Sequence, residues 1–186
     1  MTKKIDIVLD TSIFVNPAGR YCFGQTTPAA LSSFIEIIDK KPEINCYMAP
    51  SVRDELNKFL EEKIPVEKTV KIKNQPPSSY TTPVPALFIY EFIEEMRNRI
   101  NKGLRIAEKY SRQKHENDDF IKTLRDEYRA ALREGFLDSK EDFDSVLLAK
   151  ELGAYLATCD QGLVKWAQKL GIPCLTAEEL KALITS

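Results

Sequence analysis

The sequence predicts an α/β fold, in which helices flank a parallel sheet and a two-helix hairpin is inserted into the sheet domain. Strand-like and helix-like segments alternate at both ends of the 186-residue chain, which is typical of βαβ units and a parallel sheet. The middle of the chain breaks this alternation with a proline-rich stretch and two long helical patterns. Hydrophobic residues at 43% and charged residues at 30% fit a globular protein with a buried core.

The first third of the chain supplies two strands and two helices. Residues 5–10 (IDIVLD) and 44–50 (INCYMAP) are short, mainly apolar runs that predict strands. Between them a helix is expected from about Pro28 to Lys40, where apolar residues recur at helical spacing. Residues 51–62 (SVRDELNKFLEE) predict another helix, with Ser51 as its N-cap in a motif that resembles a capping box.

The middle third is expected to leave the sheet. Residues 64–85 contain five prolines among polar residues, so we expect a linker or an extended loop there rather than a helix or strand. Helical patterns follow at 86–112 and 120–135, with a break at 114–118 (KHEND). Two antiparallel helices joined by a short polar turn form a helical hairpin.

The last third returns to alternation of helix and strand. Gly153 and Gly171 are expected to end two of its helices. The expected bounds are helices at 140–152, 161–170 and 177–184, and strands at 154–159 and 172–175. The core domain should therefore combine residues 1–85 and 136–186, interrupted by the hairpin at 86–135.

Composition argues against several functional classes. No apolar run is long enough to span a bilayer, and the N-terminal residues do not resemble a signal peptide, so we expect a cytoplasmic protein. The four cysteines form no C-x-x-C pair and are expected to be free, buried thiols. Because His115 is the single histidine, a zinc site and a histidine-based mechanism lack support. The net charge of −1 means that any binding of nucleic acid would need a local basic patch.

Acidic residues are expected to gather at the carboxyl edge of the sheet, where ligands bind in parallel α/β folds. Asp10 ends the first strand, and Asp160 follows a strand near the C-terminus. The start of a helix contributes Asp138, Asp142 and Asp144. Carboxylates placed together repel one another unless cations neutralise them, and oxygen ligands without histidine or cysteine favour Mg²⁺ or Mn²⁺. Such ions align a water molecule for attack on a phosphodiester and stabilise the leaving oxygen.

Each acid alone has an ordinary structural explanation, because aspartate is common at strand-to-helix turns and at helix N-termini. At about 3.6 residues per turn, Asp142 lies about 40° from Asp138, whereas Asp144 lies about 200° from Asp142. The three carboxylates face one point only if the helix begins late or its first turn is irregular. Otherwise one of them is a cap or acts indirectly.

Three short motifs carry a resemblance to a known family. D-T-S at 10–12, DSVLLA at 144–149 and TCD at 158–160 together resemble the PIN-domain nucleases. With the acidic string D-x-x-x-D-x-D, the proline-rich linker and the inserted hairpin, nearly the whole chain resembles the HARP family, the small RNA-free ribonuclease P enzymes of bacteria and archaea. The resemblance implies endonucleolytic removal of the 5′ leader from precursor tRNA with a divalent metal, and assembly into dimers and larger homo-oligomers.

The resemblance also implies roles for individual acids. PIN nucleases carry an acid in the helix after the second strand, and Glu55 occupies that place, although a solvated helix residue is an equally good interpretation. We expect Thr11 and Ser12 to orient the acids by hydrogen bonding, and Asp138 to lie close to the metal. The residues expected to hold the ions are Asp10, Asp142, Asp144 and Asp160.

The hairpin carries a local excess of positive charge. Residues 97–133 contain eleven basic and six acidic residues, an excess of five that the rest of the chain offsets. On the second helix, basic residues recur every three or four positions and share one face: Lys122, Arg125, Arg129 and Arg133. This face is predicted to follow the phosphates of a folded RNA, which is recognised largely by shape. An ordinary solvated helix face is the alternative.

The first helix of the hairpin has a broad apolar stripe, which we expect to form core or subunit contacts. The stripe consists of Phe88, Phe92, Ile93, Met96, Ile100 and Leu104.

Two other functions compete with ribonuclease P activity. One is a toxin-type PIN ribonuclease that cuts other RNAs, and the other is a non-catalytic, PIN-like RNA-binding protein. The long insertion argues against the toxin type, which is usually close to the bare core. The complete set of acids argues against the non-catalytic protein.

Overall fold

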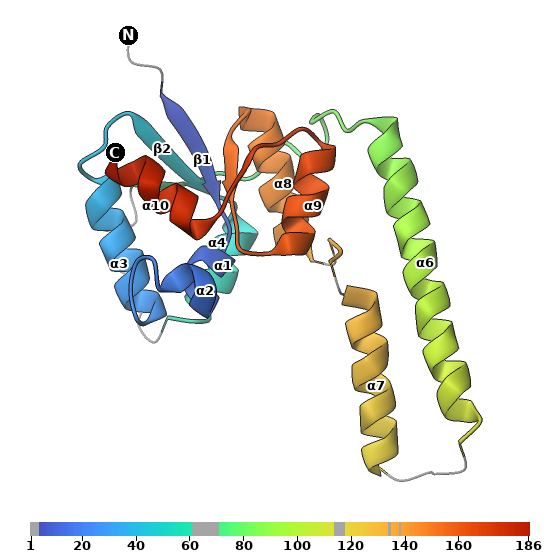
Figure 1. The fold of residues 1–186 in the computed structure, drawn as a ribbon. Coiled ribbons are helices and arrows are strands. Elements are labelled where there is room, and N and C mark those ends of the chain that lie inside the picture. The colour runs from blue at the N-terminus through green and yellow to red at the C-terminus, as the bar shows by residue number, and fades with distance from the viewer. Residues whose placement is uncertain (1–3, 61–70, 114–117, 134, 138) are drawn as a thin grey trace. The chain divides into compact units, whose positions relative to one another are not determined.

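A computed structural model describes residues 4–60, 71–113, 118–133, 135–137 and 139–186. It shows the α/β fold that the sequence predicts (Figure 1). The chain divides into two compact units, which we call the core unit (Met1–Pro83 with Ser139–Ser186) and the hairpin unit (Val84–Asp138).

The core unit is built on a five-stranded sheet in the order β3-β2-β1-β4-β5, in which every described neighbouring pair is parallel. The strands are β1 (Ile5–Leu9), β2 (Ile44–Met48), β3 (Ile72–Asn74), β4 (Tyr155–Ala157) and β5 (Cys174–Leu175). At the centre, Val8 of β1 is in register with Tyr47 of β2 and Leu156 of β4. The last three residues of β1 are fully buried, which explains its almost continuous apolar sequence.

Helices cover both faces of this sheet (Figure 1). On one side α10 contacts α2 and α3, and on the other α8 contacts α4 and α9. Their bounds are α1 (Ser12–Val15), α2 (Pro17–Arg20), α3 (Thr27–Ile38), α4 (Pro50–Asn57), α8 (Lys140–Leu152), α9 (Gln161–Lys169) and α10 (Ala177–Thr185). Gly153 ends α8 with a left-handed φ of 59°, as the sequence predicts. Aromatic rings fill the space beneath α3, where Phe34 makes edge contacts with Phe14 and Phe23.

The hairpin unit pairs two helices, α6 (Ala86–Ser111) and α7 (Asp118–Arg133). Arg99 is buried between them, and its guanidinium donates hydrogen bonds to the carbonyl oxygens of Ala131 (3.3 Å) and Leu132 (3.4 Å). The last carbonyl groups of a helix lack N–H donors from a following turn. The Arg99 side chain supplies donors to two of these carbonyl groups at the end of α7.

A second set of contacts holds the same two helices further along. The hydroxyl of Tyr110 donates to Glu127 across the hairpin at 2.8 Å. Gly103 lets the ring of Tyr128 pack against α6, since a Cβ at this position would lie 2.7 Å from the Cε2 atom of the ring. The pairing of α6 and α7 thus depends on specific side chains in the C-terminal halves of both helices.

Two local predictions about the core unit were wrong. Residues 72–74 form the edge strand β3 rather than a loop. The strand was not predicted because only Ile72 is buried, and its other residues are polar and exposed. Helix α4 begins at Pro50 with Ala49 as its N-cap, so Ser51 is not the cap and its hydroxyl is available for another partner. Residues 61–70 and 114–117, which include most of the predicted hairpin turn, lie outside the described residues.

The four cysteines are free thiols, as expected, but only one is buried. Burial raises the pKa of Cys46 to about 12, so this thiol stays protonated at neutral pH. The other three are partly exposed, so the expectation of buried thiols was wrong for them. Within the described part of the chain, no helix is long and apolar enough to cross a membrane.

Candidate active site

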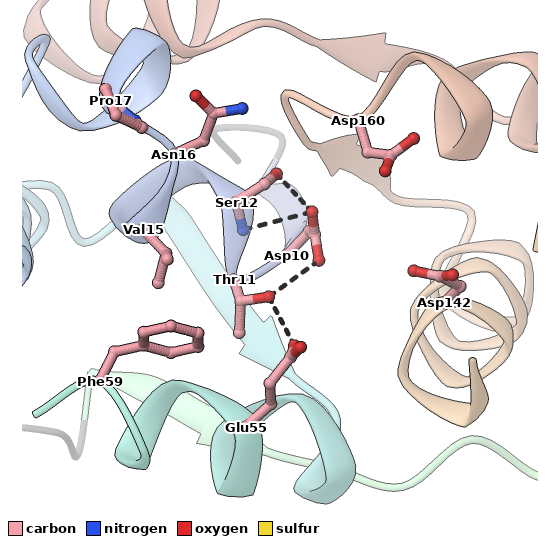
Figure 2. Close-up of a pocket in the computed structure, with 10 residues that line it drawn as sticks. All are labelled: Asp10, Thr11, Ser12, Val15, Asn16, Pro17, Glu55, Phe59, Asp142 and Asp160. Atoms are coloured by element: carbon pink, nitrogen blue, oxygen red, sulfur yellow. Dashed lines mark hydrogen bonds between the residues drawn. The ribbon is translucent and has the colours of Figure 1, made fainter. Parts of the chain in front are cut away.

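A pocket opens at the carboxyl edge of the sheet, where β1 and β4 lie side by side (Figure 2). This is the point at which the strand order reverses, since the chain adds β2 and β3 on one side of β1 and later β4 and β5 on the other. Ligands of open parallel sheets bind at such a point. The pocket is lined by Asp10, Thr11, Ser12, Val15, Asn16, Pro17, Glu55, Phe59, Asp142 and Asp160.

Asp10 is the buried carboxylate at the base of this pocket. Its Oδ2 accepts a hydrogen bond from the Thr158 hydroxyl at 2.8 Å and others from the hydroxyl and backbone N–H of Ser12. Burial raises the pKa of Asp10, and the hydrogen bonds from Ser12 and Thr158 act in the opposite direction. The side chain is therefore fixed in orientation by three donors.

The two hydroxyls that hold Asp10 also bind the backbone beyond β4. The N–H of Cys159 donates to Ser12 Oγ at 2.8 Å, and the N–H of Asp160 donates to Thr158 Oγ1 at 3.0 Å. Each hydroxyl thus donates to the acid that follows β1 and accepts from the segment that follows β4. These bonds join the ends of the two strands into one rigid edge.

Thr11 connects Asp10 with α4. Its hydroxyl donates to Glu55 Oε2 at 2.7 Å and lies 3.5 Å from Asp10 Oδ1. Figure 2 shows Glu55 pointing from α4 toward this hydroxyl. The sequence left two interpretations of Glu55 open, and the structure places it among the acids of the pocket.

Asp160 combines a structural contact with its place in the pocket. Its Oδ1 accepts the backbone N–H groups of Gly162 (2.6 Å) and Leu163 (3.0 Å), so it is the N-cap of α9. The carboxylate is nevertheless exposed and lines the pocket. At α8 the capping residue is Ser139, whose hydroxyl accepts the N–H of Asp142 at 3.0 Å. The side chain of Asp142 is therefore not needed as a cap, and it lies in the pocket.

The acids of the 138–144 segment separate in the structure. Asp142 lies in the first turn of α8 and lines the pocket, whereas Asp144 is not among the lining residues. The hydroxyl of Ser51 donates to Asp144 Oδ2 at 2.6 Å, one turn before Glu55 on α4. The difference follows from the angle of about 200° between positions 142 and 144 of a regular helix. Asp138 lies outside the described residues.

The chemistry of the pocket fits a hard divalent cation. Four carboxylates line it, and no basic side chain does so in the described part of the chain. Carboxylate and hydroxyl oxygens are the ligands that Mg²⁺ and Mn²⁺ prefer. No three described Asp, Glu, His or Cys side chains are grouped closely enough to hold an ion.

One side of the pocket was absent from the sequence prediction. Val15, Pro17 and Phe59 give it an apolar lining. Only the spacing of Phe59, four positions after Glu55, would have indicated that both side chains reach one place.

The predicted RNA-binding face lies on α7 of the hairpin unit. Lys122, Arg125 and Arg129 are exposed and line a shared shallow groove, together with Asp118, Ile121 and Asp126. Within the described hairpin, none of the three basic side chains forms an ion pair. The side chain of Arg133 lies outside the described part.

A parallel sheet in this order, with carboxylates where its strand order reverses, is the architecture of a PIN-type nuclease. The family model of the PINc domain ribonucleases matches residues 6–186. A relative from Thermodesulfovibrio yellowstonii named RNA-free ribonuclease P is 46% identical over 187 residues, covering 99% of this chain and 95% of its own. The chain therefore belongs to the RNA-free ribonuclease P family of PINc domain ribonucleases, and it is an endoribonuclease.

Relatives of the same name extend across distant organisms. The protein from Pyrococcus furiosus is 42% identical, with 97% of this chain and 92% of its own covered. The protein from Haloarcula marismortui is 37% identical, with 97% and 90% covered. The similarity includes the hairpin as well as the sheet, because the matched segments span almost the full length. The family resemblance seen in the sequence is thereby confirmed.

Proposed function

We propose that this enzyme removes the 5′ leader of precursor tRNA by hydrolysing a single phosphodiester, without an RNA subunit. The carboxylate-lined pocket at the sheet edge carries this proposal, in a chain that matches RNA-free ribonuclease P over almost its full length. The proposed place of action is the cytoplasm, where bacteria and archaea make their tRNA precursors.

The proposed cofactor is Mg²⁺ or Mn²⁺, held by the acids of the pocket. When bound, such ions provide an activated water and stabilise the leaving oxygen. Oxygen ligands come from four separate places in the chain: Asp10 just after β1, Glu55 on α4, Asp142 on α8 and Asp160 just before α9. Asp144 does not line the pocket and accepts the Ser51 hydroxyl; it remains a proposed ligand, and Asp138 is proposed to lie close by.

The protein's own contribution is to hold these ligands in place before the substrate arrives. Ser12 and Thr158 fix one carboxylate oxygen of Asp10, and Thr11 fixes Glu55 beside it. Ligands that do not reorganise during the reaction stabilise the developing charge most effectively. The hydroxyl groups are thus proposed to set the geometry of the acids rather than to react.

The basic face of α7 is proposed to bind the tRNA backbone. Lys122, Arg125 and Arg129 are exposed and spaced every three or four residues, so they present a row of positive charge along one helix face. Folded RNA is recognised mainly through its phosphates and shape. The position of Arg133 on the same helix makes it a proposed fourth member of the row.

The exposed face of α6 is proposed to bind a second copy of the chain. Five of its apolar residues are between 41% and 56% exposed and fall within about 80° of one another on a helix. They are Ile89, Ile93, Met96, Ile100 and Leu104. A continuous apolar stripe in water is unfavourable, and a matching stripe on another copy would bury it. We call these five residues the α6 stripe.

A cleavage assay separates the proposed function from its competitors. The protein is incubated with Mg²⁺ and a precursor tRNA, and the cut positions are mapped from a 5′ label. One cut at the mature 5′ end is expected. Scattered cuts would instead favour a toxin-type ribonuclease, and the absence of cuts would favour a non-catalytic RNA-binding protein.

The assignment of the pocket is tested by removing charge from its acids. Asp142→Asn and Asp160→Asn should each lower the cleavage rate at least about 100-fold, because a neutral amide is a much weaker ligand for a hard cation. Precursor-tRNA affinity and the melting temperature should change little, since asparagine can replace Asp160 as an N-cap and the cap of α8 is Ser139 rather than Asp142. Asp54→Asn on the exposed side of α4 is the matched control and should cleave normally. Wild-type rates in both pocket variants would contradict the assignment.

A further inference from the structure

The pocket has an apolar side that the acids do not explain. Phe59 is 49% exposed and lines the same pocket as the carboxylates. Figure 2 shows its ring beside Val15, across the pocket from Asp142. The backbone N–H of Phe59 donates to the carbonyl of Leu56 at 3.0 Å, so the ring follows the helical turn that carries Glu55.

This ring differs from the phenylalanines that build the core. Phe14, Phe23 and Phe34 are buried and contact one another, whereas Phe59 contacts no aromatic ring in the described part of the chain. With about half of its surface exposed, this ring buries less apolar area than the core phenylalanines do. Carboxylates that hold cations and a phosphate have no need of an apolar neighbour. An apolar part of the substrate does need one.

The apolar surfaces of RNA are the faces of its bases. Proteins bind unpaired bases by stacking them on aromatic side chains. In a precursor tRNA the cut phosphodiester joins an unpaired leader to a base-paired stem. Stem bases are covered on both faces by their neighbours, whereas the last base of the leader has a free face.

We infer that Phe59 is the specificity-determining residue of the pocket, and that its ring stacks on the base of the last leader nucleotide. The inference rests on the proposed function, since it needs a phosphodiester at the acids and an unpaired base next to it. Stacking accepts any base, because every base has a π-face. The contact therefore recognises an unpaired nucleotide at this position rather than a particular base.

The experiment combines a protein change with a substrate change. Two precursor tRNAs are compared, one normal and one lacking only the base of the last leader nucleotide. For the wild type, loss of this base should lower kcat/KM about tenfold, within the range for one stacked base. Phe59→Ala should cleave both substrates at the same lowered rate, because without the ring the base has no stacking partner in the pocket. Phe59→Trp should restore the difference between the substrates.

Tyr155 provides a matched control, since it is another partly exposed aromatic residue (39%) and begins β4 at the end opposite the pocket. Tyr155→Ala should keep the full tenfold difference between the substrates. If Phe59→Ala proves unstable by thermal melting, Phe59→Leu is measured instead, and it should also lose the difference.

Three outcomes would overturn the inference: equal wild-type rates on both substrates, a full difference in Phe59→Ala, or no restoration by Phe59→Trp. A wild-type protein that makes no cut at the mature 5′ end would overturn the proposed function as well. Correct cutting without discrimination between the substrates would overturn only the role of Phe59.

Discussion

Thr158 serves two acids with a single hydroxyl. It donates to Asp10 and accepts the backbone N–H of Asp160, and it is only 2% exposed. A buried group that loses its hydrogen-bond partner has no water to replace it, so the cost is the full desolvation of that group. The orientation of the Asp10 carboxylate and the backbone position of Asp160 therefore depend on this hydroxyl.

Replacing Thr158 by valine removes the hydroxyl and keeps the shape. Thr158→Val should lower the free energy of unfolding by about 1–3 kcal/mol, because it removes a donor from the buried Asp10 carboxylate and the acceptor of the Asp160 N–H. The cleavage rate under single-turnover conditions should fall further than this loss of stability explains, at least about tenfold, since Asp10 loses a fixed donor. Thr158→Ser keeps the hydroxyl and should restore most of the rate. A rate unchanged in Thr158→Val would show that the hydroxyl has only a structural role.

Ser51 and Asp144 form a second polar contact between α4 and α8, at 2.6 Å. If Asp144 serves the reaction, Asp144→Asn should lower cleavage at least about 100-fold, as removal of a metal ligand does. Ser51→Ala frees the carboxylate and should lower cleavage about three- to tenfold, in line with one hydrogen bond to a charged group. The double variant should be no slower than Asp144→Asn, because Ser51 acts through Asp144. Independent, multiplying effects in this cycle would contradict the pairing.

Among the elements, helix ends were predictable where a single residue decides them. Gly153 and Gly171 both adopt left-handed φ values, which other residues rarely accept. By contrast, α1 and α2 contain four residues each, too few to show a helical period in the sequence. The edge strand β3 buries one residue, so it shows no alternation either. These elements form because the rest of the fold holds them.

The active-site acids were predictable where the end of a strand decides their position. Asp10 and Asp160 follow strands, and the ends of parallel strands must meet at one edge. The roles of Glu55 and Asp144 depend instead on where a helix begins and which way it faces. Those quantities are set by packing between α4 and α8, which no local pattern records. The apolar side of the pocket was not predicted, because Val15 and Pro17 lie on the short helices α1 and α2, which show no helical period in the sequence.

The basic face of α7 is tested by charge reversal. Arg125→Glu with Arg129→Glu should weaken precursor-tRNA binding at least about tenfold while changing the maximal rate little, since both residues are proposed to bind phosphates and neither lines the acidic pocket. In a plot of the logarithm of affinity against the logarithm of salt concentration, the slope should become shallower by about one unit for each lost phosphate contact. Reversal of exposed Lys40 on the core unit is the control. Unchanged affinity and salt dependence would exclude α7 from RNA binding.

For the whole molecule, the α6 stripe predicts self-association. Ile93→Glu with Ile100→Glu should shift the protein to a smaller assembly, because two charges in an apolar interface cost far more than they do in water. The measurement is the mass by size-exclusion chromatography with light scattering over a range of concentrations. Leu87→Glu is the control, because Leu87 is 66% exposed but lies well away from the stripe on the helix surface. A mass that is unaffected by the double change would place the interface elsewhere.

The hydrogen bond from Thr158 to Asp10 joins residues 148 positions apart in the chain, with the hairpin unit between them. A ribosome delivers residues in order, so β1 and Asp10 leave it long before their partners in β4. Until then the central strand lacks a neighbour on one side, and the carboxylate lacks one of its three donors. A nascent or prematurely terminated chain can therefore contain the hairpin, with its proposed tRNA-binding face, without a formed nuclease site. The nuclease site can form only after the last segment has been synthesised.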